Sequence, residues 1–461
     1  MKPSNPAIVF TAACAAWILL PGCAGLPKPD PAAVQRKAGD RAGVAVAWPQ
    51  NDADRRAADD AVARLLGGEL TADAAVKIAV LNNRALQATF EDLGVSQADV
   101  LAAGTLHNPT FAAIIRWPNE EPRGPDVEVS LAADLLDGLL MPLRKQVAND
   151  RLAQTEDRVG QGVLDLAAQV KEAFYRYQSA EAFAARLRVL GETSHAALDV
   201  AKRQYDAGSI NQLELESRSL SAEQATADLM RATAELDARR EAVNRLLALN
   251  SSQVTWHAAA LTDLPPTEPA YGDLESAALT DRLDLAAAKS EVTLADTALN
   301  LKRKTRFLPT SVDLGIDSER NPDGSRVTGP SLQVGLPIFD QGQAEVARLE
   351  AEQRRAQAKA DALEAAVRSD VRGAQKALQS GRALADYYRV TLLPQERQLV
   401  DDTLLQYNAM QKSVFELLAA KESEVDAERA AIEAIRDYWL ARVALERAVG
   451  GRLAPTVSTA P

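Results

Sequence analysis

The chain has few of the residue types on which catalytic and metal-binding sites depend. Its 461 residues include only two cysteines, Cys14 and Cys23, and three histidines, His107, His195 and His257. Both cysteines lie near the amino terminus, so no disulfide framework or thiolate metal cage is available to the rest of the chain. The histidines lack ligand-like spacing, and no nucleophile motif or phosphate-binding loop is present. We therefore expect no enzyme activity, no cofactor and no metal site.

Aromatic residues are scarce, and acidic residues outnumber basic ones. Phe, Trp and Tyr make up 5% of the chain, hydrophobic residues 47% and charged residues 25%. This composition is too apolar for a disordered chain and too polar for a bundle of membrane helices. It favours extended Ala-rich helices over a bulky globular core. The formal net charge of -12, without a strong Lys or Arg cluster, argues against nucleic acid as a partner.

The amino terminus carries an export signal. Lys2 is followed by an apolar stretch, residues 7–20, that is too short for a stable transmembrane anchor. Leu20-Pro21-Gly22-Cys23 then resembles a bacterial lipobox, and Ala24 fits sorting to the outer membrane. We expect a signal peptide over residues 1–22, lipidation of Cys23 and a tether over residues 23–68. The alternative is a plain signal peptide with an incidental cysteine.

The two halves of the chain carry similar motifs about two hundred residues apart, which indicates an internal duplication. Gln204-Tyr205-Asp206-Ala207 precedes Leu213-Glu214-Leu215 at the spacing at which Gln406-Tyr407-Asn408-Ala409 precedes Phe415-Glu416-Leu417. Each half is predicted to contain a helix, two short strands, a long helix, a turn and a helix. We expect a first repeat over residues 69–250, a linker over 251–271, a second repeat over 272–451 and a flexible tail over 452–461.

Four short segments alternate apolar and polar residues, as strands do when one face meets lipid and the other meets water. Two soluble hairpins packed against helices are the alternative. A four-stranded sheet cannot close in lipid, because its edges would expose unpaired backbone groups. Copies of the chain must then pool their strands, and a conducting pore favours three copies and a 12-stranded barrel over two copies and eight strands. The apolar positions are Phe111, Ala113, Ile115 and Trp117; Val127, Val129, Leu131, Ala133 and Leu135; Val312, Leu314 and Ile316; and Leu332, Val334, Leu336 and Ile338.

Long helices are predicted between the strands and the repeated turns. No proline occurs from about Leu143 to Tyr205, and an unbroken helix of that span approaches about 90 Å. A second helix, from about Asn211 to Leu249, returns antiparallel after a break at Gly208. In the second half, Pro394 is expected to kink or end a helix. The coiled-coil seams comprise Leu152, Val159, Val163, Leu166, Val170, Phe174 and Tyr177 in the first half, and Leu418, Val425, Ile432 and Trp439 in the second.

The ordered set of lipobox, duplicated halves, strand pairs and repeated turns resembles the TolC-like outer-membrane efflux family. Leu336-Pro337-Ile338-Phe339-Asp340, followed by Gly342, also looks like that family's junction between strand and helix. The resemblance covers about Leu70 to Gly451. It implies an α+β membrane protein that forms a homotrimer, with a barrel in the outer membrane and an α-helical tunnel across the periplasm.

The resemblance also implies a function. Such a trimer is the passive channel of a tripartite pump, in which an inner-membrane transporter and a periplasmic adaptor deliver drugs or heavy-metal ions for export. The two helical turns would form the periplasmic tip and adaptor contact, although Met410 stands where the first turn has Gly208. Because the helix ends of three copies must converge at this tip, we also expect the gate there. A lipid-anchored periplasmic coiled-coil scaffold is the alternative function, but it leaves the strand alternation unexplained. The candidate tip residues are Tyr205, Asp206, Gly208, Gln212, Glu214, Tyr407, Gln411, Lys412 and Glu416.

Overall fold

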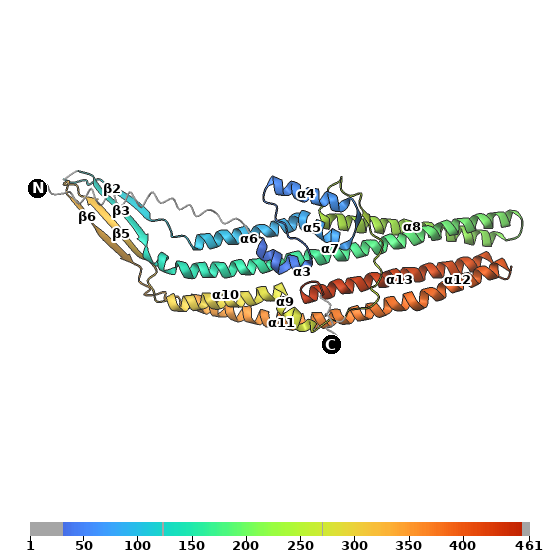
Figure 1. Cartoon of the computed structure of the whole chain (residues 1–461). Coiled ribbons are helices and arrows are strands. Elements are labelled where there is room, and N and C mark those ends of the chain that lie inside the picture. The colour runs from blue at the N-terminus through green and yellow to red at the C-terminus, as the bar shows by residue number, and fades with distance from the viewer. Residues whose placement is uncertain (1–30, 122–123, 270, 454–461) are drawn as a thin grey trace.

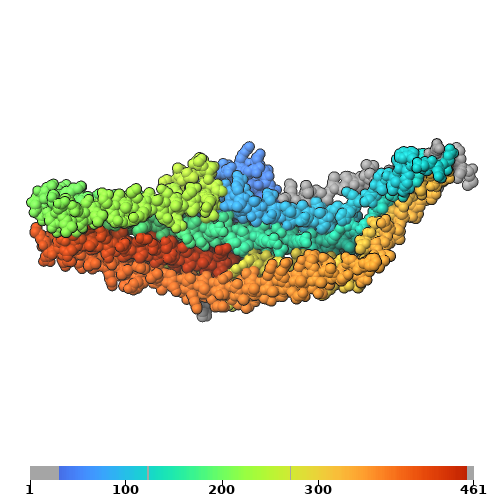
Figure 2. All heavy atoms as spheres, turned by 180° about the vertical axis from the view of Figure 1, so that it is seen from behind, coloured from blue at the N-terminus to red at the C-terminus, as the bar shows by residue number. Residues whose placement is uncertain are grey.

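The molecule is long and narrow, with a small sheet at one end and two helical turns at the other. The computed structural model describes residues 31–121, 124–269 and 271–453. The signal peptide, Cys23 and most of the carboxy-terminal tail lie outside these residues. Figure 1 shows bundled helices running from the sheet to the turns, and Figure 2 shows the same extended body from behind, with the strands bent away from the helical axis.

The longest helix, α7 (Leu135–Asp206), contains 72 residues, which corresponds to about 108 Å at 1.5 Å per residue. Its continuity confirms the predicted helix, but it starts earlier than predicted and includes Pro142. The Asp134 side chain caps it by accepting from the Leu136 amide, so the helix begins directly after a strand. Pro142 is the eighth residue of α7, beyond the first turn, so it removes one backbone hydrogen bond, and the helix nevertheless continues through it. The returning helix α8 (Gln212–Leu247) matches the prediction closely.

The predicted duplication is visible in the order of the elements. Helices α5 (Ala72–Asn82) and α6 (Arg84–Ala103) precede the first strand pair, and α9 (Leu274–Asp281) and α10 (Leu283–Thr305) precede the second. Each helix pair is broken at one extended residue with nearly the same backbone angles: Asn83 has φ −69° and ψ 113°, and Arg282 has φ −66° and ψ 119°. The second half then continues through α11 (Gln343–Tyr387), α12 (Leu393–Asn408) and α13 (Val414–Val449).

A π-helical turn, η2 (Tyr388–Leu392), separates α11 from α12. Pro394 occupies the first turn of α12, where its missing amide hydrogen costs least. Helix α11 thus ends at Tyr387, and a local change of helix type precedes the proline. The helical path continues through it to the turn at the far end of the molecule.

The sheet has the order β2-β3-β5-β6, and each neighbouring pair is antiparallel. Its strands are β2 (Thr110–Arg116), β3 (Asp126–Asp134), β5 (Val312–Arg320) and β6 (Arg326–Val334). The fourth strand was predicted too late in the sequence, because Leu336 and Ile338 lie beyond its end. Its earlier start follows from a tight turn in which the Asn321 amide donates to the Ser325 carbonyl at 2.9 Å.

Residues 31–66 differ from the tether expected over residues 23–68. They form α2 (Ala32–Val34), a π-helical segment η1 (Gln35–Gly39), α3 (Asp40–Ala42) and α4 (Asp52–Leu66). Val34 and Ala38 are fully buried, and Lys37 Nζ lies 2.7 Å from Asp157 of α7. Buried apolar side chains and the ion pairs of Lys37 and Arg41 therefore fix this segment to the helical body, although its composition resembles that of a linker.

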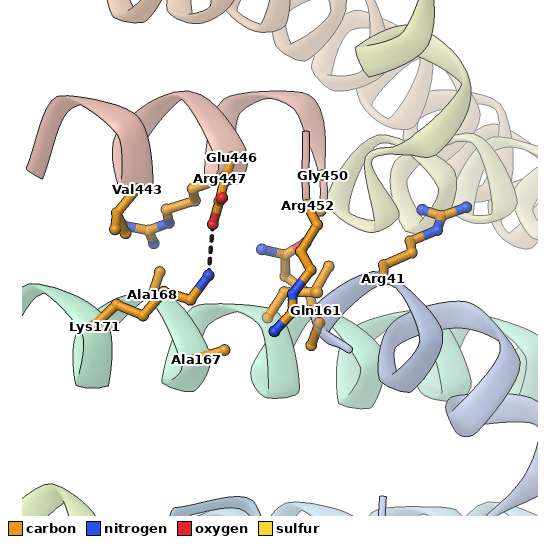
Figure 3. A pocket seen from close by; sticks show the side chains of 13 residues that line it. Arg41, Gln161, Ala167, Ala168, Lys171, Val443, Glu446, Arg447, Gly450 and Arg452 are labelled. Carbon is orange, nitrogen blue, oxygen red and sulfur yellow. Dashed lines mark hydrogen bonds and ion pairs between the residues drawn. The ribbon is translucent and has the colours of Figure 1, made fainter. Parts of the chain in front are cut away.

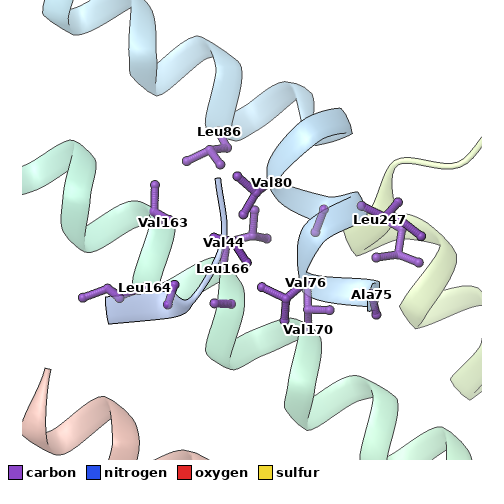
Figure 4. Packing of buried hydrophobic residues seen from close by; sticks show 14 of the residues in the cluster. Val44, Ala75, Val76, Val80, Leu86, Val163, Leu164, Leu166, Val170 and Leu247 are labelled. Atoms are coloured by element: carbon purple, nitrogen blue, oxygen red, sulfur yellow. The ribbon is translucent and has the colours of Figure 1, made fainter. Parts of the chain in front are cut away.

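The main core lies midway along the molecule, where α5 and α6 pack on α7 and α8. Figure 4 shows Val76, Val163 and Leu247 converging there. A short parallel sheet, β1 (Glu69–Leu70) with β4 (His257–Ala258), lies in the same region. Nearby, Lys171 of α7 binds Glu446 of α13 at 2.6 Å, so the two repeats are joined across the interface shown in Figure 3.

The first predicted seam is confirmed: from Val159 to Tyr177 its side chains are buried, and only Leu152 is half-buried. The second seam is wrong in part. Leu418 and Val425 are buried, but Ile432 and Trp439 are half-buried, while Tyr438 is fully buried. Helix α13 contacts both α7 and α11, and a helix between two partners buries a wider stripe than a two-helix seam.

Candidate functional site

The four strands share one apolar face. Leu131 lies opposite Phe111 on one side and opposite Ile316 on the other. Further along, Leu314 lies opposite Leu332. Because directly opposite residues point to the same side of a sheet, the apolar faces predicted for separate strands join into one surface. In the single chain this surface is open: Leu314 is 50% exposed and Leu332 is 66% exposed.

The other face of the sheet is acidic. Glu128 lies directly opposite Glu319. Arg116 is the only basic residue on this face of the four strands, and it contacts Asp126 at 3.1 Å and Glu128 at 2.8 Å. One face thus suits hydrocarbon, and the other suits water and cations. The carboxylates on the acidic face are Asp126, Glu128, Asp134, Asp313, Asp317 and Glu319.

Both outer strands of the sheet, β2 and β6, have a free edge. Pro330 lies in β6 opposite Ile316. Opposite residues of an antiparallel ladder alternate between hydrogen-bonded and non-hydrogen-bonded pairs. Because Asn321 and Ser325 form a hydrogen-bonded pair, Ile316 and Pro330 form a non-hydrogen-bonded pair. Pro330 therefore removes no hydrogen bond to β5; the donor that it lacks lies on the free edge of β6, where pairing with another strand has one hydrogen bond fewer. The free edges leave the sheet open for pairing with other strands.

Both helical turns lie at the end of the molecule opposite the sheet (Figure 1). Gly208 of the first turn has φ 70°, and Met410 of the second has φ 58°. The second turn therefore adopts the same left-handed conformation without a glycine. This conformation costs an ordinary residue about 1 kcal/mol or more, and the Met410 side chain is 95% exposed. No packing contact explains the choice of methionine at this position.

The predicted tip residues make polar contacts within each turn. Gln212 donates to Glu216 at 2.8 Å in the first turn. In the second, Lys412 lies 3.1 Å from Glu416, which also accepts from the Ser413 amide at 2.9 Å. Within the described residues, none of these contacts joins the two turns. Side chains at the turns without a hydrogen bond or ion pair in that part of the chain are Tyr205, Asp206, Glu214, Tyr407 and Gln411.

A contact that the sequence did not reveal joins the two hairpins near the tip. The Arg218 guanidinium of α8 lies 3.4 Å from the centre of the Phe415 ring of α13. Burial lowers the pKa of Arg218 below its ordinary value, with Glu422 and Glu214 opposing the shift. The signal for this contact was a difference between the repeats: the second motif has Phe415 where the first has Leu213.

A groove of about 800 Å³ runs between α8 and α13 above α7. Charged side chains of both signs line it, including Arg231 and Glu235 from α8 and Arg429 and Glu433 from α13. Its apolar floor includes Phe183, over which Arg429 lies at 4.8 Å. The groove thus offers both apolar area and charged partners along the helical end of the molecule.

Two opposite long edges of the helical body carry exposed apolar side chains. One edge is α8, and the other is the path from α11 through α12, as Figure 1 shows. Two unlike surfaces on one chain allow head-to-tail association, which closes into a ring when the rotation fits. The exposed residues are Leu213, Leu220 and Met230 on α8, and Leu384, Tyr387, Val390, Leu399 and Leu405 on the other edge.

No helix in the described part of the chain is long and apolar enough to cross a membrane. Within those same ranges, His, Cys, Asp and Glu side chains form no group of three that could hold a metal ion.

Comparison with known proteins supports the fold expected from the sequence. No family model matches the chain. The cobalt-zinc-cadmium resistance protein CzcC of Cupriavidus metallidurans is 22% identical over 398 residues, which cover 84% of this chain and 91% of CzcC. The chain therefore corresponds to nearly the whole of this relative.

Solved structures agree with the described fold. The structure of CusC, studied for transmembrane channel formation, matches with a TM-score of 0.69 and 18% identity over 85% of this chain and 92% of CusC. The outer membrane channel CmeC of Campylobacter jejuni matches with a TM-score of 0.68 and 15% identity over 87% of each chain. The predicted fold class of long helices with four strands is confirmed.

Proposed function

We infer that this chain, whose resemblance to the TolC-like outer-membrane efflux proteins is confirmed, is the outer-membrane channel of an efflux pump. It lies in the outer membrane and extends into the periplasm. The observation that carries this proposal is the sheet: its register joins four apolar faces into one surface, with acids behind it and free edges on both sides. A helical body of about 100 Å then leads away from the membrane.

The working unit in this proposal is a homotrimer. Three four-stranded sheets, joined β2 to β6, give a 12-stranded barrel that leaves no free edge in lipid. The helical bodies then associate through their exposed apolar edges and continue the barrel as a tunnel. Passage through such a tunnel needs no chemistry from the protein, so we propose no enzymatic role.

The proposed cargo is a small solute, with heavy-metal cations placed before drugs. CzcC is a cobalt-zinc-cadmium resistance protein. The acidic face of the sheet would line the barrel lumen. In each chain this face carries six carboxylates and one arginine, Arg116. A lumen of this charge favours cations over anions. Drugs remain the alternative cargo.

The proposed partners are an inner-membrane transporter and a periplasmic adaptor, which meets the tip. Tyr205, Asp206, Gly208, Gln212 and Glu214 form the first surface for this contact. The groove between α8 and α13 extends that surface away from the turns and supplies apolar area with charges of both signs. The second turn contributes Tyr407, Gln411, Lys412 and Glu416.

We also propose that Cys23 becomes the lipidated amino terminus after removal of residues 1–22. The two repeats over residues 69–250 and 272–451 then form the channel. Mass spectrometry of the membrane fraction is expected to find an acylated Cys23, and Cys23→Ser is expected to reduce retention in the outer membrane. An unmodified Cys23 in membrane fractions would refute the anchor without refuting the channel.

Two measurements test the pump assignment. Deleting the gene should raise sensitivity to heavy-metal cations, and the wild-type chain should restore resistance. Single cysteines in place of Ser209 or Met410 should cross-link to the adaptor, whereas Arg56→Cys on the exposed α4 should not. Equal cross-linking from all three positions, or unchanged sensitivity to metals and drugs, would favour the alternative of a periplasmic scaffold.

A further inference from the structure

Two arginines interrupt the apolar face of the sheet at the end farthest from the helices. Arg320 is the last residue of β5, Arg326 is the first residue of β6, and they lie directly opposite each other. Val127 of β3 lies opposite Arg320 and shares the same face. Both arginine side chains are exposed. The two positive charges therefore point to the side that the proposed function assigns to lipid.

The pair is close, and no carboxylate among the described residues forms an ion pair with it. The hydrogen-bonded pair Asn321–Ser325 precedes it in the ladder, so Arg320 and Arg326 form the next, non-hydrogen-bonded pair, with Cα atoms about 4.5 Å apart. Neither side chain has a hydrogen bond or ion pair among the described residues. The Asp323 carboxylate in the connecting turn is engaged by the Ser325 amide and hydroxyl at 2.8 and 2.6 Å.

Other nearby acids do not serve this pair. Glu319 precedes Arg320 in the strand, so its side chain points to the opposite face. Like charges directly opposite each other destabilise a sheet. An arrangement that costs stability in the isolated chain is explained if an external anion lies between the two guanidinium groups.

On β5 and β6 the polarity of this face changes in steps, whereas on β2 and β3 it stays apolar to Ile115 and Val127. Leu314, Ile316 and their neighbours are apolar. The next row is formed by Ser318 and Thr328, whose hydroxyl groups are 2.9 Å apart, and the arginines follow. Hydrocarbon, hydroxyl and guanidinium side chains thus succeed one another in the order in which a membrane leaflet passes from acyl chains to headgroups.

The depth of the arginines agrees with this order. Eight residues separate Val312 from Arg320 along β5, which is about 26 Å at 3.3 Å per residue. A strand tilt of about 40° reduces this to about 20 Å along the membrane normal, close to the apolar band of about 25 Å in outer-membrane barrels. Arg320 and Arg326 therefore lie at the outer boundary of that band.

We propose that Arg320 and Arg326 bind the phosphate of a lipid headgroup in the outer leaflet of the membrane. This inference rests on the proposed function, because it requires the apolar face to meet lipid. Guanidinium groups match phosphate with paired, charge-assisted hydrogen bonds. Each trimer has three such pairs around the barrel, and a bound phosphate offsets the repulsion within each pair.

The test measures lipid retention by the purified full-length trimer in native mass spectrometry, with diphosphorylated lipid A as the probe. Replacing both residues, Arg320→Ser with Arg326→Ser, is expected to weaken retention about tenfold or more. Arg320→Lys with Arg326→Lys keeps the charge but loses the planar fork, and an intermediate loss is expected. Arg56→Ser with Arg64→Ser removes two exposed arginines of α4 and should leave retention unchanged.

Two further arms identify the ligand. Lipid A without phosphates should bind wild type and the double serine variant equally. Inorganic phosphate should not displace lipid A, because it lacks the acyl chains that the apolar face holds. Equal retention of lipid A by wild type and the serine variant, or displacement by inorganic phosphate, would overturn the proposal.

Trimer yield, melting temperature and channel conductance are recorded for every variant. If the serine variant conducts as a stable trimer and still retains lipid A as wild type does, only the phosphate site is wrong. If wild type forms no trimer or no channel, the proposed function is wrong, and the lipid site is wrong with it.

Discussion

The guanidinium of Arg218 lies 3.4 Å from the centre of the Phe415 ring, and this contact joins the two helical hairpins of one chain near the tip. Such contacts contribute about 0.5–2 kcal/mol, more when the cation is desolvated. Replacing Arg218 by Ala should therefore loosen the tip. We expect higher basal conductance and greater sensitivity to large antibiotics, with an unchanged amount of folded trimer.

Substitutions of Phe415 test whether the contact needs the aromatic ring or only an apolar side chain of similar size. Phe415→Leu should act like Arg218→Ala, and Phe415→Tyr should behave like wild type. The combination Asp206→Ala with Glu416→Ala removes two predicted gate carboxylates and should also raise basal conductance. Wild-type conductance in Phe415→Leu would show that the cation–π contact does not hold the tip closed.

A pair of neighbouring residues tests which face of the sheet meets lipid. Leu314→Arg places a charge on the apolar face, where it costs about 2–4 kcal/mol near the membrane midplane. Asp313→Arg places the same side chain on the acidic face, opposite Asp134, where an ion pair replaces repulsion. Native mass spectrometry should find fewer trimers only for Leu314→Arg. Equal damage from both substitutions would contradict the assignment of the faces.

Two glycines within α7 are expected to respond oppositely to alanine. A Cβ at Gly160 would lie 2.7 Å from Leu283 Cδ1 and 3.4 Å from Ala38 Cβ, whereas a Cβ at Gly191 would meet no atom within 4 Å. Overpacking costs about 1–3 kcal/mol, and alanine gains about 1 kcal/mol over glycine in a helix. Gly160→Ala should lower the melting temperature, and Gly191→Ala should raise it. The reverse order by circular dichroism would refute this packing.

The second helical turn should weaken at low pH. The Ser413 amide and, to a lesser extent, Lys412 lower the pKa of Glu416 below its ordinary value of 4.5. Because the folded-state pKa is depressed, the ionised carboxylate stabilises the turn above about pH 4.5, and this contribution is lost as the pH falls through the folded value. Hydrogen exchange at the Ser413 amide is measured in wild type and in Glu416→Gln at each pH. Wild type should be better protected than the variant only at the higher pH.

Glu214 supplies the control for this measurement. It occupies the matching position in the first turn, where Asn211 caps its backbone amide at 2.9 Å but its own carboxylate has no hydrogen bond within the described residues. Glu214→Gln should therefore leave exchange at its turn unchanged. A pH dependence in Glu416→Gln equal to that of wild type would show that another group controls the second turn.

The sequence predicted the elements whose residues repeat with a clear period. The heptad spacing from Val159 to Tyr177 predicted side chains that are buried, but α7 packs against several helices there, including α5, α8 and α13, so more of its surface is buried than the seam alone. The alternation around Leu131 and Leu314 predicted two faces, and the strand register aligned them. Strand ends were harder to predict, because Leu336 and Ile338 continue the alternation after the ladder has ended.

Contacts between distant segments could not be predicted from local pattern. The helix over residues 35–39 depends on burial of Ala38 against α7, and its Ala- and Pro-rich surroundings resemble a linker. Tyr438 is buried more deeply than Trp439 because α13 packs on α7, α11 and α12 at once. Arg218 reaches Phe415 only after both hairpins have formed, so neither residue alone signals the contact.

The central claim is that identical chains assemble into a channel through a membrane. The most direct measurement is single-channel conductance of the purified protein in a planar lipid bilayer, with Leu314→Arg as the assembly-defective comparison. We predict discrete conductance steps for wild type that favour cations over anions, and few or none for Leu314→Arg. A stable wild-type protein that remains monomeric and never conducts would contradict the account.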